Sequence, residues 1–167
     1  SIPRSWQQAT AALDALGRTD RVLVIPGGTG GNYRWGMRSP DDLFPSLLDR
    51  PVAVRNTVVA RGDAAGNLLS AFDIAVAQGA AKDGSLSTTA RYLGASDVLV
   101  RNDLLTEEIG GPPPWLVVRQ AEGDRTRQRH RVLWHRRPGS PRGVVHCSPP
   151  RDRLGERASR VHRAQRV

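Results

Sequence analysis

A buried strand is predicted by the stretch RVLVIP at residues 21–26, where a run of apolar, mostly β-branched residues ends at a proline. A glycine-rich loop, GGTGG at residues 27–31, follows directly. A second clear strand is predicted at residues 97–102 (DVLVRN) and a short one at residues 52–56 (VAVRN). The chain therefore contains a sheet, and the segments between these strands decide its class.

Segments with helical periodicity alternate with the strands. Residues 6–16 carry Trp6, Ala9, Leu13 and Leu16 at helical spacing, and Gly17 stands where helices commonly end. Further helices are predicted from a cap at Asp63 or Asn67 to Gly79 and from Ser85 to Gly94. We expect a short helical turn within residues 41–48 and a last strand at residues 115–118. The alternation predicts an α/β fold: a small, open, mostly parallel sheet with flanking helices.

The charge divides the chain near residue 120. Of the 25 Lys+Arg and 16 Asp+Glu, residues 1–120 hold 12 of each, whereas residues 121–167 hold 13 Arg and 4 acids, so 13 − 4 gives the whole net charge of +9. All four His and the single Cys also lie after residue 120. We therefore predict an α/β domain over residues 1–120 and a disordered Arg/Pro-rich tail over residues 121–167.

Three interpretations of the tail stay open. A shifted reading frame of GC-rich DNA would explain the abundance of Arg, Pro and Gly and the loss of Ile, Phe, Tyr and Asn. A plain disordered tail has the same composition. A basic arm would bind nucleic acid through counterion release, and that binding would weaken steeply with salt and vanish when the tail is deleted.

The motifs that would indicate catalysis or metal binding are incomplete. The loop at residues 27–36 has neither the third glycine of a dinucleotide-binding fingerprint nor the Lys-Ser/Thr of a phosphate loop. Residues 1–120 lack His and Cys, which excludes Ser–His and Cys–His nucleophile systems there. His130 and His135 match half of a zinc-finger pattern without its Cys pair. We predict no catalytic residue, no metal site, no cofactor and, because the apolar runs are short, no transmembrane helix.

Two clusters are candidate ligand-binding sites. Tyr33, Arg34 and Trp35 combine aromatic faces, which stack on sugars, with a guanidinium that binds hydroxyl or phosphate oxygens. The alternative is that the rings close the edge of a small core. Residues 101–103 (Arg101, Asn102 and Asp103) follow a strand at the edge where α/β sheets bind ligands, although capping of the loop is an equal alternative.

Four strings carry a family resemblance: VLVIP at residues 22–26, YRWG at 33–36, RPVAVRN at 50–56 and DVLVRNDL at 97–104. In order and spacing they resemble one region of the actinobacterial α-(1→3)-arabinofuranosyltransferases. The resemblance covers roughly residues 1–120 and is expected to end there. The GGTGG loop ahead of Tyr33 departs from the pattern, which leaves the geometry of this loop undefined.

The resemblance implies a function for a longer parent protein. Members of this family are membrane glycosyltransferases that transfer arabinofuranose from a polyprenyl-phosphate-arabinose donor to arabinogalactan or lipoarabinomannan. This chain, which begins without Met, is then a soluble extracytoplasmic piece, inactive alone and lacking the catalytic loop. Its expected partners are the membrane-spanning part of the same protein and the cell-wall glycan, with no nucleic acid unless the tail is genuine.

The resemblance also adds Arg55 to the candidate ligand-binding residues, because it lies in the third string. Two other functions stay open. One is a small basic protein that binds nucleic acid through the tail, and the other is a carbohydrate-binding module that uses Tyr33 and Trp35.

Overall fold

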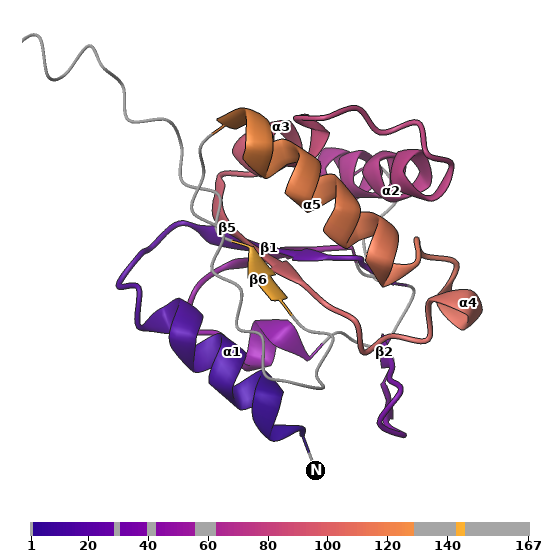
Figure 1. Cartoon of the computed structure of the whole chain (residues 1–167). Helices are drawn as coiled ribbons and strands as arrows, with labels where there is room; N and C mark the ends of the chain where they lie inside the picture. Colours follow the sequence, from indigo (N-terminus) through magenta and orange to yellow (C-terminus); the bar gives the residue numbers. More distant parts are fainter. Residues whose placement is uncertain (1, 29–30, 40–42, 56–62, 129–142, 146–167) are drawn as a thin grey trace, which may run out of the picture.

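The sheet has the strand order β4-β1-β5-β6 in the computed structural model, which describes residues 2–28, 31–39, 43–55, 63–128 and 143–145 (Figure 1). Strands β1, β4 and β5 are parallel, and β6 is antiparallel to β5. The predicted open, mostly parallel sheet is confirmed. Its strands are β1 (Arg21–Ile25), β4 (Val52–Val54), β5 (Ala95–Val100) and β6 (Gly143–Val145).

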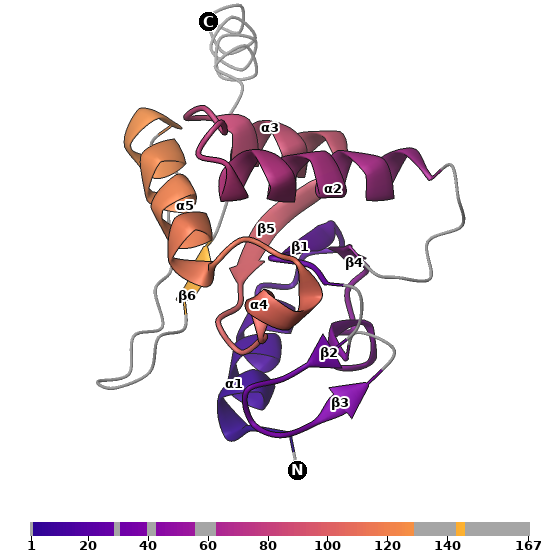
Figure 2. The ribbon, with the colours of Figure 1, turned by 90° about the vertical axis from the view of Figure 1, so that its right-hand side faces the viewer.

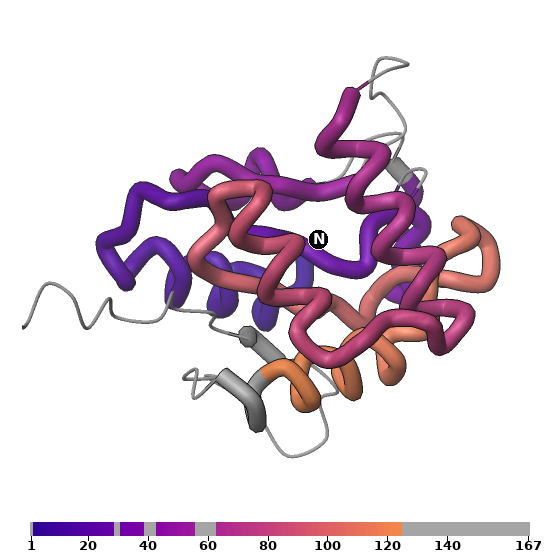
Figure 3. Tube along the Cα trace, turned by 90° about the horizontal axis from the view of Figure 1, so that it is seen from above, coloured from indigo at the N-terminus to yellow at the C-terminus, as the bar shows by residue number. Residues whose placement is uncertain are grey.

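Helices cover both faces of the sheet, which makes a three-layer arrangement (Figures 1 and 2). One face packs against α1 (Arg4–Asp14) and the 3-10 turn η1 (Phe44–Ser46). The other packs against α2 (Ala64–Ala77), α3 (Ser85–Tyr92) and α5 (Pro114–Gln128), which form the upper layer of Figure 1 and lie nearest the viewer in Figure 3. Two short elements lie outside the four-stranded sheet. One is a two-stranded hairpin formed by β2 (Gly31–Asn32) and β3 (Arg38–Ser39), and the other is the short helix α4 (Thr106–Ile109).

Alternation along β1 builds the two cores. Val22 and Val24 face the α1 layer, whereas Leu23 and Ile25 face the α2/α3/α5 layer, and all four are at most 1% exposed. A strand buried on both faces is a continuous apolar run, which explains why residues 21–26 were readable from the sequence.

The three predicted helices are confirmed, and local chemistry sets their ends. Asp63 caps α2 by accepting hydrogen bonds from the N–H groups of Ala65 and Gly66, so the first of the two possible caps is the one used. The expected turn near residue 44 is η1, and residues 41 and 42 lie outside the described part. No helix of the described residues is both long and apolar enough to cross a membrane.

The predicted strand at residues 115–118 is wrong, because these residues belong to α5. Pro114 occupies the first helical position, where its missing N–H has no intrahelical partner to lose. Val117, Ala121 and Asp124 then recur at helical spacing and are buried. Burial of this face outweighs the strand preference of the neighbouring valines.

The predicted boundary at residue 120 falls inside α5, which continues to Gln128. Within the predicted tail, residues 143–145 form β6 on the edge of β5. Residues 129–142 and 146–167 lie outside the described residues, and with them the half zinc-finger pattern and most of the predicted tail.

Candidate functional site

The candidate residues gather near the carboxyl edge of the parallel strands. Arg55 directly follows β4, and residues 101–103 follow β5. Tyr33, Arg34 and Trp35 connect β2 to β3, and an antiparallel bridge between Tyr33 and Leu104 joins this connection to the segment after β5. The structure therefore brings both predicted clusters together.

Four aromatic rings pack beneath this edge. The Trp6 ring stacks on Phe44 with centroids 4.2 Å apart, and Tyr33 stacks on Trp35 at 4.9 Å. Trp6 meets Tyr33 edge-on at 5.3 Å, so the two stacks form one cluster. Tyr33 is only 2% exposed, and its hydroxyl oxygen accepts the N–H of Leu43. Tyr33 is thus a core side chain in this structure, whereas Trp35 is half-buried.

Arg101 lies against the aromatic cluster rather than in solvent. Its guanidinium carbon is 5.0 Å from the Phe44 centroid, 5.3 Å from that of Trp6 and 5.4 Å from that of Tyr33. These distances lie within the range of cation–π attraction. Its Nε also pairs with the Asp103 carboxylate at 3.3 Å. The cation is therefore held by ring faces and by one buried carboxylate.

Asp103 balances this buried cation. Its burial raises the pKa of the carboxyl group, while the neighbouring Arg101 cation opposes the rise. The backbone carbonyl of Asp103 accepts the N–H of Arg34 at 2.7 Å. Asp103 therefore links the segment after β5 to the β2–β3 connection through its backbone, while its side chain holds Arg101.

Arg34 and Asn102 complete the two predicted clusters. Arg34 points outward, where its Nε donates to the carbonyl of Leu104 and its Nη2 pairs with Glu107 at 3.3 Å. Half of the Arg34 side chain is exposed, and Asn102 is half-buried. Of the predicted ligand-binding residues, Arg34 and Trp35 are the ones whose side chains are best placed to meet a ligand.

Arg55 lies apart from the aromatic cluster, against α2. Its Nε is 3.4 Å from Oδ2 of Asp73, and both side chains are largely buried. Burial raises the pKa of Asp73 to about 6, against the opposing effects of Arg55 and of a hydrogen bond from the Gly27 backbone. Sequence reasoning missed Asp73, although a lone carboxylate among the apolar residues of a helix was a signal.

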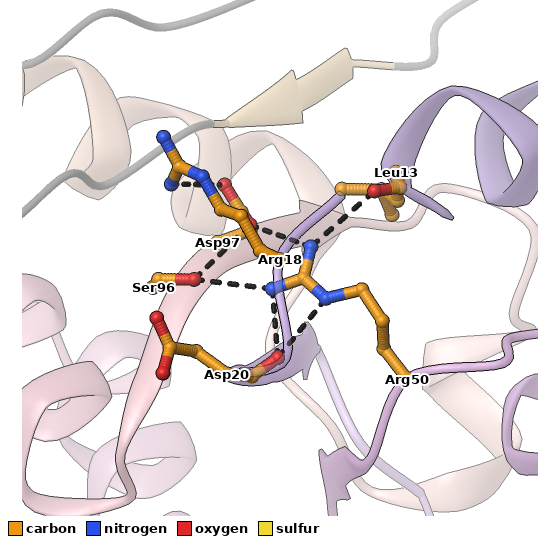
Figure 4. Close-up of polar contacts among 6 residues, drawn as sticks. All are labelled: Leu13, Arg18, Asp20, Arg50, Ser96 and Asp97. Carbon is orange, nitrogen blue, oxygen red and sulfur yellow. Dashed lines mark hydrogen bonds and ion pairs between the residues drawn. The ribbon is translucent and has the colours of Figure 1, made fainter. Parts of the chain in front are cut away.

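A second polar network lies at the opposite edge of the sheet (Figure 4). Arg50, two residues before the start of β4, pairs through Nη1 with the fully buried Asp97 of β5 at 2.7 Å. The Arg50 guanidinium also donates to the Asp20 carbonyl at 2.7 and 3.0 Å and to Ser96 Oγ at 3.1 Å. Arg18 approaches the other Asp97 oxygen at 3.4 Å. Arg50 and Asp97 belong to two of the resemblance strings, and their role here is to join β1, β4 and β5.

These polar groups chiefly hold backbone segments in place. The described residues contain no group of three or more His, Cys, Asp or Glu side chains that could bind a metal ion. The arginines pair with Asp73, Asp97 and Asp103, each of which is at most 3% exposed. Each of these carboxylates is therefore engaged by an arginine of the fold.

Comparison with known proteins relates the chain to one family. The family model described as "Alpha-(1->3)-arabinofuranosyltransferase, N-terminal GT-C domain" matches residues 1–137. An α-(1→3)-arabinofuranosyltransferase of Mycolicibacterium smegmatis is 36% identical over 125 residues, and one of Mycobacterium tuberculosis is 33% identical over 127 residues. Both alignments cover 74% of this chain and 9% of the relative, so the chain spans about a tenth of their length.

Solved structures of the same kind show the same fold. A mutant cryo-EM structure of arabinofuranosyltransferase AftD from Mycobacteria matches with a TM-score of 0.64 and 28% identity, over 74% of this chain and 10% of that chain. A second AftD structure has a TM-score of 0.68 at 22% identity, over 91% of this chain and 13% of that chain. The resemblance expected over roughly residues 1–120 is confirmed, and the family model extends it to residue 137.

Proposed function

Because the chain belongs to the α-(1→3)-arabinofuranosyltransferase family, in a part matched by the model of its N-terminal GT-C domain, we propose that it is an architectural segment of a membrane glycosyltransferase. The family match over residues 1–137 carries this proposal. The buried ion pairs Arg50–Asp97 and Arg55–Asp73 support it, because they join segments of the described residues that lie far apart in the sequence.

In this proposal the parent enzyme transfers arabinofuranose from a polyprenyl-phosphate-arabinose donor to arabinogalactan or lipoarabinomannan. The α/β unit lies on the extracytoplasmic side of the plasma membrane, beside the membrane-spanning part of the same protein. Catalytic groups come from that other part, because Arg101 and Asp103 are engaged with each other and with the aromatic cluster. The unit supplies position and shape.

A graft tests the architectural role. Residues 1–137 replace the matching segment of the Mycolicibacterium smegmatis relative, and arabinofuranosyl transfer to an arabinan acceptor is measured in membranes. We expect the graft to retain transfer and the isolated 167-residue chain to show none. Transfer by the isolated chain would contradict the proposal. So would an inactive graft that accumulates in membranes at the level of the parent.

The β2–β3 connection, which carries Arg34 and Trp35, is the place where the unit would touch the acceptor glycan. Trp35 is half-buried and Arg34 half-exposed, side by side on the β2–β3 connection, which suits stacking on a sugar beside a hydrogen-bond donor. Titration of the chain with arabinan fragments should show weaker binding after Trp35→Ala. Trp115→Ala is the matched control, because that indole is 63% exposed on α5. Equal binding by both variants would remove the glycan contact from this connection and leave the architectural role intact.

A further inference from the structure

Three other segments of the fold converge on Gly27, at the carboxyl edge of β1. A Cβ atom at Gly27 would collide with the Cβ atom of Arg55, which follows β4. A Cβ atom at Gly111, in the turn before α5, would lie 3.3 Å from the Gly27 carbonyl oxygen. The N–H of Gly28 donates to the Arg55 carbonyl at 3.2 Å. The segment after β1 is thus fastened to the segment after β4 with no room for a larger residue.

A buried ion pair completes the junction from the side of α2. Asp73 is 3% exposed and lies with Oδ2 3.4 Å from Nε of Arg55, and the Gly27 backbone hydrogen-bonds to the same carboxylate. The Arg55 side chain keeps 15% of its surface exposed, so solvent lies within its reach. One carboxylate therefore holds both the guanidinium and the backbone that follows β1.

Among the described side chains, Arg55 is the charged group that pairs with Asp73. The helices α3 and α5 pack against α2, but the charged side chains described on them point elsewhere. Arg91, Arg119 and Glu122 are exposed, and Asp124 accepts hydrogen bonds from Gly84 and Ser87. The carboxylates of α4 pair with Arg34 and Arg38. Within the described part of the chain, the charge of Asp73 thus acts on the guanidinium of Arg55.

We propose that Asp73 is an acid-operated latch for Arg55: the carboxylate holds the guanidinium against α2, and uptake of a proton releases the guanidinium to solvent at the carboxyl edge of the sheet. The direction follows from charge, because a neutral Asp73 leaves a largely buried cation without its counter-ion. Arg55 regains hydration by moving outward. A released guanidinium presents planar donors to phosphate or carboxylate groups, so the edge binds anions better in mild acid.

The pH range follows from the environment of the carboxyl group. Burial raises the pKa of Asp73 to about 6, and the effects of Arg55 and the Gly27 backbone are too small to cancel the rise. The Gly27 hydrogen bond, the tight packing and the Gly28–Arg55 backbone bond do not require the charge. Release therefore concerns the Arg55 side chain, while the backbone junction stays closed.

Nuclear magnetic resonance of the 167-residue chain tests the latch. The Nε–H signal of Arg55, assigned with the Arg55→Lys variant, is followed from pH 7.5 to pH 5.0. We expect one transition in its chemical shift with a midpoint near pH 6. In Asp73→Asn the Arg55 signal should stand at pH 7.5 where the parent signal stands at pH 5.0, without a midpoint.

A surface pair supplies the control. Glu107→Gln removes a carboxylate from Arg34, and because the Glu107 side chain is 61% exposed, the Arg55 midpoint should stay unchanged. A parent signal that is flat over the range overturns the latch, as does a midpoint that survives in Asp73→Asn. If Asp73→Asn does not fold, the parent titration still decides, because a flat Arg55 signal alone overturns the proposal.

Discussion

Three buried carboxylates, Asp73, Asp97 and Asp103, each pair with an arginine, and the pairs of Asp73 and Asp97 join segments far apart in the sequence. An ionised carboxylate in a protein interior is tolerated when an opposite charge and hydrogen bonds compensate the loss of water. Each of these side chains is at most 3% exposed, so each depends on its partner. At the scale of single residues, removal of one partner therefore disturbs the chain more than removal of an exposed pair.

Asp97→Ala should be strongly destabilising. The substitution leaves Arg50, whose side chain is 4% exposed, as a buried cation without its closest counter-ion. We expect the free energy of unfolding to fall by about 3–5 kcal/mol, measured by urea denaturation. Glu107→Ala, which removes an exposed partner of Arg34, should change it by about 1 kcal/mol or less. Similar losses in both variants would contradict the role assigned to the Arg50–Asp97 pair.

Asp73 predicts a pH dependence of stability. Its pKa is raised in the fold from 3.8 to about 6, so between these values the folded state keeps a proton that the unfolded state has released. Its stabilising contribution is full below the unfolded pKa and is lost as pH rises through the folded pKa. At about 1.4 kcal/mol per pKa unit, the free energy of unfolding changes by roughly 3 kcal/mol over this pH range.

Unfolding of the parent and of Asp73→Asn from pH 4 to pH 8 isolates this effect. The stability of the parent relative to the variant should decline as pH rises. A constant difference would contradict the raised pKa.

At the scale of elements, α5 holds α3 in place. The Asp124 carboxylate of α5 accepts hydrogen bonds from the backbone N–H groups of Gly84 (2.5 Å) and Ser87 (2.7 Å) and from the Ser87 hydroxyl (2.9 Å). The first N–H groups of a helix have no intrahelical partner, so a carboxylate from another helix serves as the cap. Contact between the two helices thus includes a buried cap as well as apolar packing.

Asp124→Ala should therefore destabilise the chain by about 1–3 kcal/mol, because it leaves buried donors of α3 without an acceptor. Thermal or urea unfolding measures the loss. Glu122→Ala on the same helix is the control, since Glu122 is exposed and should change stability by about 0.5 kcal/mol or less. Equal effects of the two substitutions would show that the cap does not contribute.

At the scale of the whole molecule, the three layers include residues beyond the change of composition at residue 120. Ala121 and Asp124 are both 2% exposed and belong to α5. The described fold and the family match both run past this boundary. The charge composition therefore changes at residue 120, but α5 continues through this point to Gln128.

Two truncations test where the folded unit ends. A chain of residues 1–120 lacks the second half of α5, whereas a chain of residues 1–128 keeps it, and both lack β6. We expect the shorter chain to be less stable by about 2 kcal/mol or more, from the lost cap and the lost burial of Ala121. Denaturation followed by circular dichroism makes the comparison. Equal midpoints would place the boundary at residue 120, as the composition suggests.

The sequence by itself determined the main elements of this protein. Strands β1 and β5 and helices α1, α2 and α3 follow from patterns within a few residues: apolar runs, helical spacing, and the capping carboxylate of Asp63. The α/β class follows from their order. Residues 115–118 show the limit of such local patterns. Their two valines favour a strand, but Pro114 at the helix start and the burial of one face of α5 favour a helix.

Only the tertiary structure decided which side chains meet. Arg50 and Asp97 are 47 residues apart, and Gly84 and Asp124 are 40 apart, so no local pattern links them. Their pairing depends on the placement of β1 between β4 and β5 and on the packing of α5 against α3. The sequence predicts Tyr33 and Arg101 as ligand contacts. In the folded chain the Tyr33 ring stacks on Trp35, and the buried Arg101 cation lies against the Tyr33 ring. Periodicity reports which face of an element is apolar, whereas the partner of a buried charge is set by the order of elements in space.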